Sequence, residues 1–464
     1  MLKTFLNWIR QVLKNLIGKS EIKSRLNIDV AVSDKMQEGV ELWSAVYENR
    51  APWLSETVQS LNLGATIASE IARMITLEMK SEITGSPRAD YHNGQFKNFL
   101  KHIRQYVEYG CAKGGIAFKP YIDGKNIAHD AVQADRFFPT AFNSAGRITG
   151  AVFVERLVKG TRYYTRLEHH ELIGTGYHIT NKAYASLTES ALGNEVSLES
   201  IDEWASVEPE AVITGVDRPL FAYFKVAQAN TVDPASPLGV SVYARATDLI
   251  KEADKQYSRL LWENEAGEMA VDIDAALLGP KDENGNYKTP KGKKRLYRTY
   301  AGIPDDTNVA NGMKVFAPQL RDQSLINSLN ELLMRIEDTC GLARGTFSNV
   351  QNDARTATEL KIMRQRSYAN VADNQKALQE ALEDYIYAMD VWATIGKLAP
   401  QGKYEVSFEW DDSIIVDTES EQAIRIQEVA SGLLKPVEYV KWRYGIKDDE
   451  TAMKMIPGME QVTE

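Results

Sequence analysis

Apolar residues recur at the spacing of one helix face in the first quarter of the chain. One such repeat runs from Leu61 to Ile83, and a phenylalanine-containing repeat runs from Gln95 to Tyr109. Apolar positions three and four residues apart indicate amphipathic helices that bury one stripe. The pattern therefore predicts that residues 20–110 are mostly helical.

Two later helices are predicted on either side of a segment with a different pattern. The first begins near Ser241, a residue type that caps helices, and continues to Gly267; the second runs from about Gln319 to Cys340. A helix of about 25 residues is roughly 40 Å long. Residues 269–318 between them contain short strand-like runs and many turn formers. This order predicts a helical hairpin with a compact β tip.

The longest helix is predicted after a polar loop, residues 345–355. Thr356-Ala-Thr-Glu359 has the form of a capping box, and no glycine or proline follows it before Gly396. A helix of about 40 residues spans roughly 60 Å, which exceeds the diameter of a small domain. Such a helix is typical of a subunit in a larger assembly.

Between residues 116 and 185 the period of the apolar positions changes to two. Ile148 to Val158 is a β-branched run that ends at Lys159-Gly160, and Asp123-Gly124 is a hairpin signal. The pattern predicts an antiparallel sheet. Further strands are predicted at Leu220–Val226 and Tyr404–Trp410, and short helices after Asp417. The fold class is therefore α+β, mainly helical, in several packed units.

Residues 1–24 begin with a basic amphipathic helix, in which Lys3, Arg10 and Lys14 interrupt the apolar positions. These charges and the lack of a small-residue cleavage site argue against a signal peptide. No run of 18 apolar residues occurs, so no membrane-spanning helix is expected. Packing on protein is the favoured interpretation of this helix; binding to a membrane surface is the alternative.

The composition narrows the possible functions. The 464 residues carry a formal net charge of −10, which disfavours a protein that holds DNA tightly by neutralising phosphates. Cys111 and Cys340 are too few for a disulfide framework, and we expect both to be buried free thiols. One exposed excursion is nevertheless basic. Its charged residues are Lys281, Lys288, Lys291, Lys293, Lys294, Arg295 and Arg298.

Motifs for catalysis and cofactor binding are missing. Gly18-Lys19-Ser20 ends like a P-loop, but Leu13 stands where the first glycine is needed. His169 and His170 are adjacent on a predicted strand and so point to opposite faces, which disfavours a shared metal ion. We predict no enzyme activity, no cofactor and no metal site.

Five segments carry a resemblance to one family, in order along roughly residues 100–445. The most specific is Gly345-Thr-Phe-Ser348 followed by Thr356-Ala-Thr-Glu359. The others are Gly114–Gly124 with Ala134–Pro139, Tyr163–Glu168 with Tyr177–Lys182, Gly239–Tyr243, and Trp410–Asp417. With these segments the chain resembles the portal proteins of tailed bacteriophages, in the branch common among phages of Gram-positive bacteria.

The resemblance implies a wing, stem, clip and crown architecture, usually in a ring of twelve. On this sequence the wing is residues 25–238, joined by the tunnel loop, long helix and strand of 344–416. The stem helices are 239–268 and 319–343, the clip is 269–318, and the crown is 417–464. The crown is short for this family, which puts its contacts with packaged DNA in doubt.

The resemblance also implies the roles of particular residues. The tunnel loop would contact DNA in the channel through Arg344, Ser348, Asn349, Gln351, Asn352, Asp353 and Arg355. The clip would dock the terminase large subunit and later the head–tail adaptor through Lys288, Lys291, Lys293, Lys294, Arg295 and Arg298. The basic residues of the clip also fit a simpler interpretation as a solvated loop.

The implied function is a channel at one capsid vertex of the virion for DNA packaging and ejection. Its partners would be copies of itself, the terminase, head–tail adaptors, and capsid and scaffolding proteins, with assembly in the host cytoplasm. Double-stranded DNA would pass through without sequence-specific binding. Two other functions remain open: a metal-dependent hydrolase acting on nucleic acid, and a membrane-surface scaffold attached by the N-terminal helix.

Overall fold

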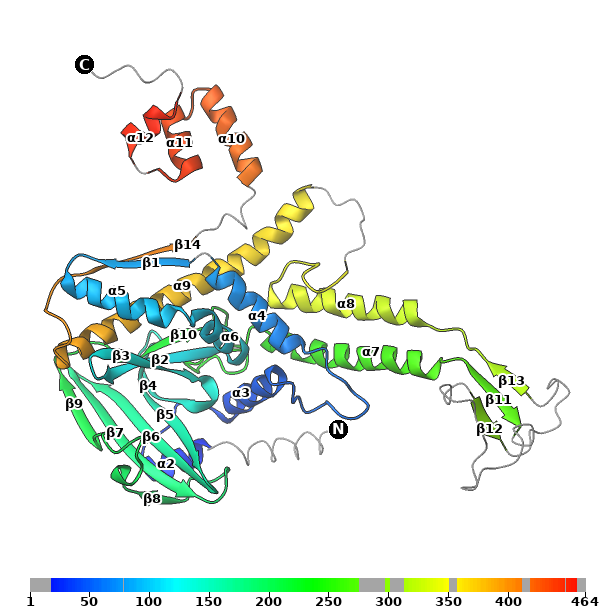
Figure 1. Cartoon of the computed structure of the whole chain (residues 1–464), viewed down its shortest axis with the longest axis horizontal. Helices are drawn as coiled ribbons and strands as arrows, with labels where there is room; N and C mark the ends of the chain where they lie inside the picture. The colour runs from blue at the N-terminus through cyan, green and yellow to red at the C-terminus, as the bar shows by residue number, and fades with distance from the viewer. Residues whose placement is uncertain are drawn as a thin grey trace.

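The structure is a computed structural model that describes residues 18–77, 79–274, 297–300, 313–349, 357–410, 418–446 and 448–456. It consists of a body of helices and sheets, an arm that projects from the body, and a small C-terminal helical unit (Figure 1). The amphipathic segment 1–17 lies outside the described residues. In the described part of the chain, no helix is long and apolar enough to cross a membrane.

The N-terminal part of the body is mainly helical, as predicted. Its helices are α2 (Lys19–Leu26), α3 (Asp34–Tyr47), α4 (Leu63–Thr76), α5 (Pro87–Leu100) and α6 (Ile103–Lys113). Ser33 and Ser86 cap α3 and α5 by accepting hydrogen bonds from backbone N–H groups in the first turn. The repeat predicted from Gln95 to Tyr109 is divided between α5 and α6.

The prediction of one helix from Leu61 to Ile83 was wrong at its C-terminal end. The helix α4 ends at Thr76, and β1 (Met79–Thr84) pairs antiparallel with the distant β14 (Glu405–Trp410). Met79 and Ile83 are four residues apart, a spacing that fits one face of a helix and also one face of a strand. The pairing with β14 makes this segment a strand. A pattern of neighbouring residues in the sequence gives no information about that pairing.

Two antiparallel sheets form the centre of the body. The larger has the order β4 (Phe137–Phe142), β5 (Ile148–Lys159), β6 (Arg162–Ile173), β7 (Gly176–Ser186) and β8 (Asn194–Val196), with β9 (Glu210–Thr214) also on β7. The smaller has the order β10 (Ala222–Lys225), β2 (Gly115–Asp123) and β3 (Asn126–Gln133). Both predicted hairpin turns are confirmed, because Asp123 pairs with Asn126 and Lys159 with Arg162.

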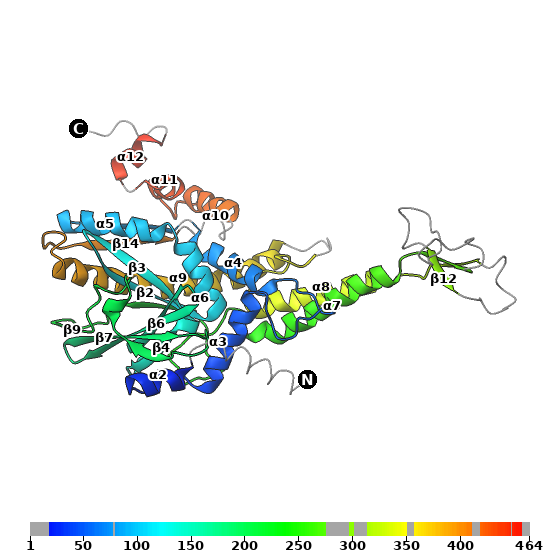
Figure 2. The same ribbon diagram turned by 60° about the horizontal axis from the view of Figure 1, so that its bottom comes forward.

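The longest helix, α9 (Ala357–Ile395), lies against the smaller sheet and α5 (Figures 1 and 2). Its 39 residues confirm the predicted uninterrupted helix and give a length of about 58 Å. Tyr385 of α9 stacks on Phe99 at 4.2 Å between ring centroids, and Phe118 meets Phe99 edge-on at 5.1 Å. This aromatic cluster joins the long helix, α5 and the sheet into one core.

The arm consists of two helices and a small sheet at its tip. The helices are α7 (Thr247–Ala266) and α8 (Asp322–Cys340), and the strands are β11 (Ala270–Asp274), β12 (Tyr297–Tyr300) and β13 (Met313–Phe316). Strand β11 is central, parallel to β12 and antiparallel to β13. The predicted hairpin with a β tip is therefore present, and Gly341 ends α8 in the left-handed conformation.

The predicted start of the first arm helix at Ser241 was wrong. The helix α7 begins at Thr247, and the Ser241 hydroxyl accepts from Tyr243 N instead of capping a helix. The preceding residues are held against the end of α6, where Val242 N donates to Cys111 O at 3.0 Å. Gly114 and Gly239 make this approach possible, since a Cβ on Gly239 would lie 2.1 Å from Gly114 O.

The C-terminal unit contains α10 (Thr418–Ala430), α11 (Pro436–Tyr444) and α12 (Asp449–Lys454), as predicted. Asp448 caps α12 by accepting from Thr451 N. Both cysteines are buried and free, as expected. Burial raises the pKa of Cys340 to about 12 and that of Cys111 further still, so both are thiols at neutral pH.

Candidate functional site

The two arm helices are fastened to each other near the tip. The Glu263 carboxylate accepts from Arg321 N at 3.1 Å, from Nε at 3.0 Å and from Nη2 at 2.7 Å. Further toward the body, Gln256 Nε2 donates to Leu325 O at 3.3 Å. These contacts hold the start of α8 beside the end of α7, so the arm is a defined two-helix element.

The base of the arm is tied to the body through Asp254. This buried carboxylate accepts from Trp53 Nε1 and from Leu61 N, both at 2.8 Å. Burial raises the pKa of Asp254, while these two hydrogen bonds oppose the rise. The loop of residues 51–62 is thereby fixed along α7.

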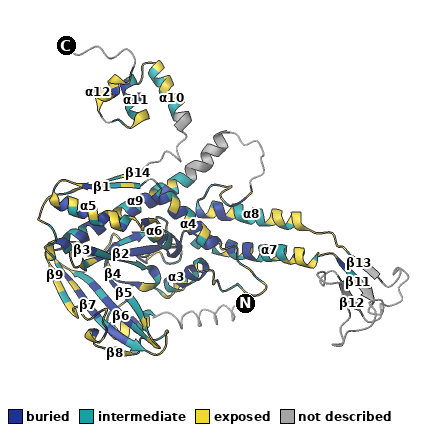
Figure 3. Cartoon of the chain, in the orientation of Figure 1, coloured by how far each residue is buried: buried dark blue, intermediate teal, exposed yellow. Residues whose placement is uncertain are grey.

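The outer part of the arm exposes much of its surface, including apolar side chains (Figure 3). A groove of about 570 Å³ lies between residues 56–59 and α7, with Trp262 on its wall. Trp262 of α7 is 63% exposed. Leu320, just before α8, and Ile326 of α8 are also exposed.

The arm helices are acidic. In α7, five acids stand against three bases, giving −2, and in α8 four acids stand against one base, giving −3. An element of this charge repels a DNA duplex, although salt screens the effect beyond about 8–10 Å.

Three of the seven predicted tunnel-loop residues lie in a turn packed on α8. Arg344 pairs with Asp338 at 2.6 Å, and Asn349 exchanges two hydrogen bonds with Asn330. Ser348 is buried, so in this conformation its hydroxyl binds Glu337 rather than facing solvent. Gln351, Asn352, Asp353 and Arg355 lie outside the described residues.

Glu337 is the residue that fixes this turn. Its fully buried carboxylate accepts from Gly345 N at 3.1 Å, from Ser348 N at 2.8 Å, from the Ser348 hydroxyl at 2.7 Å, and from Phe347 N. The turn therefore belongs structurally to the end of α8. Sequence analysis missed Glu337, because a single acid beside the apolar stripe looks like any solvated helix residue.

Most of the residues that were predicted to dock partner proteins at the clip are not among the residues that the structure describes. Lys288, Lys291, Lys293, Lys294 and Arg295 lie outside the described residues. Arg298 lies on β12, at the register position opposite Asp272 of β11. The assignment of a docking surface to these residues stays a prediction.

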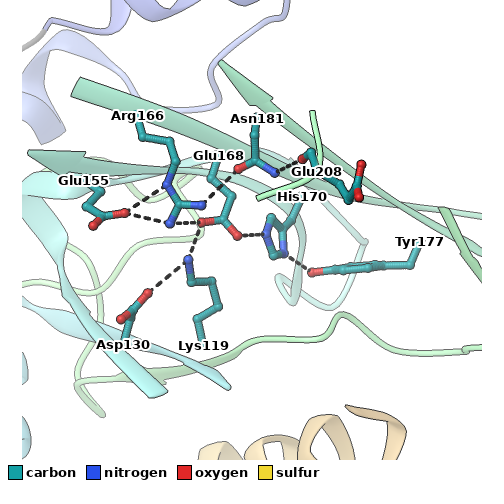
Figure 4. Close-up of polar contacts among 9 residues, drawn as sticks. All are labelled: Lys119, Asp130, Glu155, Arg166, Glu168, His170, Tyr177, Asn181 and Glu208. Carbon is teal, nitrogen blue, oxygen red and sulfur yellow. Dashed lines mark hydrogen bonds and ion pairs between the residues drawn. The ribbon is translucent and has the colours of Figure 1, made fainter. Parts of the chain in front are cut away.

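A buried cluster of charges joins the two sheets of the body (Figure 4). At its centre, the Glu168 carboxylate contacts Lys119 Nζ, Arg166 Nη2 at 3.1 Å and His170 Nε2 at 2.7 Å. Burial alone would raise the pKa of Glu168, but these cationic and hydrogen-bonding neighbours hold that pKa well below its usual range. Glu168 therefore stays ionised at neutral pH.

The outer members of the cluster satisfy the remaining groups. Asp130 lies 3.2 Å from Lys119, and Glu155 accepts from Arg166 at 2.7 Å. Because the carboxylate of Glu168 only accepts, His170 donates through Nε2 and accepts the Tyr177 hydroxyl through Nδ1 at 2.7 Å. The protein's own cations already occupy this site, so it serves to fasten β2 to the larger sheet.

Within the described ranges, no group of three or more metal-ligating side chains comes together. His169 and His170 point to different partners, Thr140 and Glu168 respectively. Burial lowers the pKa of His169 to about 4, so it is neutral at physiological pH.

Comparison with known families decides the identity of the chain. A model of the family described as "Phage portal protein, SPP1 Gp6-like" matches residues 93–463, most of the length. The chain belongs to the phage portal protein family. As a portal protein it is a structural component of the phage particle, and the family implies an oligomeric ring that associates with the capsid at a vertex of the virion.

No curated protein matches this portal protein. Among solved structures, a chain from "Neck of native GTA particle computed with C12 symmetry" is 11% identical, with 82% of this chain and 89% of that chain covered and a TM-score of 0.36. At that score the likeness carries no argument about function.

Proposed function

We propose that this portal protein forms a ring, most often of twelve copies, around a channel through which double-stranded DNA enters and leaves the capsid. The family match over residues 93–463 is the observation that carries the proposal. The shape of the subunit supports it: a thick body and a narrow arm suit side-by-side packing around an axis (Figures 1 and 2). In this role the protein is not an enzyme; a separate motor supplies the energy.

We propose a division of the subunit into the four parts implied by the family resemblance. Residues 25–238 with 344–416 are the wing, and the helices within 239–268 and 319–343 are the stem. The strands within 269–318 form the clip, and residues 417–464 form the crown. The positions of α7 and α8, with the small sheet at their tip, support this division.

Low adhesion of DNA in this channel is proposed to come from the charge of its wall. The stem helices are acidic, and twelve subunits carry a formal charge of about −120. A duplex that is repelled from the wall moves with little friction. The tunnel loop then makes weak, reversible contacts, through Asn349 and the polar residues 351–355 that follow it.

Motor and tail proteins are proposed to dock at the clip. The clip's residues 281–298 contain seven basic side chains and two acidic ones, against the acidic background of the chain. A basic surface at the tip suits an acidic surface on a partner. We assign the terminase large subunit and then the head–tail adaptor to it, and capsid and scaffolding proteins to the wing.

Charge reversal at the clip tests this assignment. The variant Lys293→Glu, Lys294→Glu, Arg295→Glu should weaken terminase binding at least about tenfold, because three favourable contacts become repulsive. The matched control reverses three exposed lysines of the wing, Lys97, Lys101 and Lys125. Biolayer interferometry on purified rings measures both. Equal affinity for wild type and the clip variant would remove the docking assignment.

A further inference from the structure

The C-terminal unit α10–α12 buries too little apolar surface to be stable by itself. Among its described side chains, the buried apolar residues are Val437, Val440 and Ala452, with Tyr439, Ile446 and Ile456 partly buried around them. Units below about 40 residues rarely fold without disulfides, metals or a partner chain. This one has no cysteine at all. Something outside the unit must supply the missing stability.

The apolar side chains that could supply it point outward. Six of the eighteen large apolar side chains that the structure shows exposed lie in this unit, although it is under a tenth of the chain. They are Ile424, Ile426, Leu433, Tyr444, Met453 and Met455. Leu433 is 83% exposed. So dense an apolar surface marks a contact with another protein.

The exposed isoleucines of α10 lie on two different sides of the helix. Arg425 faces α11, with its guanidinium 4.5 Å from the centroid of the Trp442 ring. Ile424 and Ile426 are one residue to either side of Arg425, and each step turns the helix by about 100°. The two isoleucines therefore flank the α11-facing stripe on opposite sides, and both are about half exposed. One partner on one side cannot cover both.

The chemistry of the surface selects the kind of partner. Residues 418–456 contain seven acids and six bases, so the unit lacks the excess of positive charge that binding to phosphate groups requires. A lipid surface would favour a helix with a strongly basic face, and α10 lacks one. A ring, by contrast, gives every subunit two neighbours that touch different faces.

We propose that neighbouring copies of this chain complete the core of α10–α12, one covering Ile424 and the other covering Ile426. Folding of the unit is then coupled to ring assembly: it is stable in the ring and opens in the free subunit. This inference rests on the proposed ring. It adds that residues 418–456 form an intersubunit belt whose order reports assembly.

Hydrogen–deuterium exchange on the full-length protein tests the coupling. Wild-type rings and free subunits, separated by size-exclusion chromatography, are labelled under the same conditions. Amides of α10–α12 should exchange at least about 100-fold more slowly in rings, because opening then requires breaking two intersubunit apolar contacts. Amides of β6 and β7, whose core lies within one subunit, should be protected equally in both forms.

Two variants separate this inference from the ring itself. Ile424→Ser with Ile426→Ser should lose most of the protection of α10–α12 in any rings that form. Ile173→Ser is the control: an equally exposed isoleucine at the end of β6, which should leave that protection unchanged. Rings with equal protection of α10–α12 in both assembly states, or with full protection in the double variant, would overturn the belt and leave the ring intact. Failure of the wild type to form any ring would overturn both proposals.

Discussion

Two buried acids in the body of the subunit differ in charge state because their neighbours differ. Glu168 is surrounded by Lys119, Arg166 and His170, which hold its pKa well below the usual range against the effect of burial. Glu41 on α3 has no cationic partner among the described contacts; its carboxylate accepts from Gln37 Nε2 at 2.9 Å. Burial raises the pKa of Glu41 to about 7. At neutral pH the same residue type is thus ionised at position 168 and about half protonated at position 41.

The raised pKa makes Glu41 a source of pH dependence. An acid whose pKa is raised on folding stabilises the protein below its unfolded pKa, and this contribution is lost as pH rises through about 7. We predict that Glu41→Gln, which stays neutral, increases the free energy of unfolding at pH 8 by about 1–3 kcal/mol. At pH 4.5 the gain should vanish.

Urea denaturation at the two pH values measures this effect. Glu82→Gln, at an exposed position of β1, is the control and should change stability little at either pH. A Glu41 variant that is no more stable than wild type at pH 8 would show that Glu41 carries its charge at little cost.

At the residue scale, the correct predictions were those that depend only on composition or on the alternation of side chains along a strand. The two free buried cysteines and the separation of His169 from His170 were predicted correctly. The buried charges of Figure 4 were not, because Lys119 comes from β2 and meets Glu168 and Arg166 of β6, a strand in the other sheet. In the sequence each looks like an ordinary strand residue with a solvated side chain.

At the scale of elements, the sequence pattern identified the arm helices, the long α9 and one hairpin in each of the two central sheets. It failed at β1, where pairing with β14 from the other end of the chain overrides a local helical pattern. It also failed at the start of α7, where a close glycine–glycine approach holds residues 239–243 in a non-helical path. Both errors come from tertiary contacts that local patterns do not encode.

The attachment of the turn at residues 344–349 to α8 gives a testable prediction at the scale of elements. Glu337→Gln replaces one accepting oxygen by a donating NH₂ group, which leaves backbone N–H groups of the turn without acceptors. Loss of one or two such buried hydrogen bonds costs about 1–3 kcal/mol. The turn should open more often, so trypsin should cleave after Arg344 at least about tenfold faster than in wild type.

Quantitative mass spectrometry of the digest measures that rate. The control is Glu331→Gln, an exposed position of α8 that pairs with Arg335 on the same helix. An unchanged rate of cleavage after Arg344 in the Glu337 variant would mean that the turn stays closed without the carboxylate. The role of Glu337 as its anchor would then be withdrawn.

At the scale of the whole molecule, the outline was predictable from the order of the elements. Two helices that flank a short β segment either project as an arm or fold back onto the body. The structure has the projecting arm (Figure 1). How subunits meet was not predictable from periodicity, since the same apolar stripe serves a core or an interface. Exposure in the folded subunit separates the two: Trp262 and Ile424 are exposed and so do not belong to the core of the subunit.

Electron microscopy of the purified full-length protein, with two-dimensional class averages, tests whether copies of this subunit surround an open passage. We expect rings with a central opening, mostly of twelve subunits, with the arms gathered on one side of the ring. Isolated compact subunits, or closed assemblies with no opening along the axis, would contradict it.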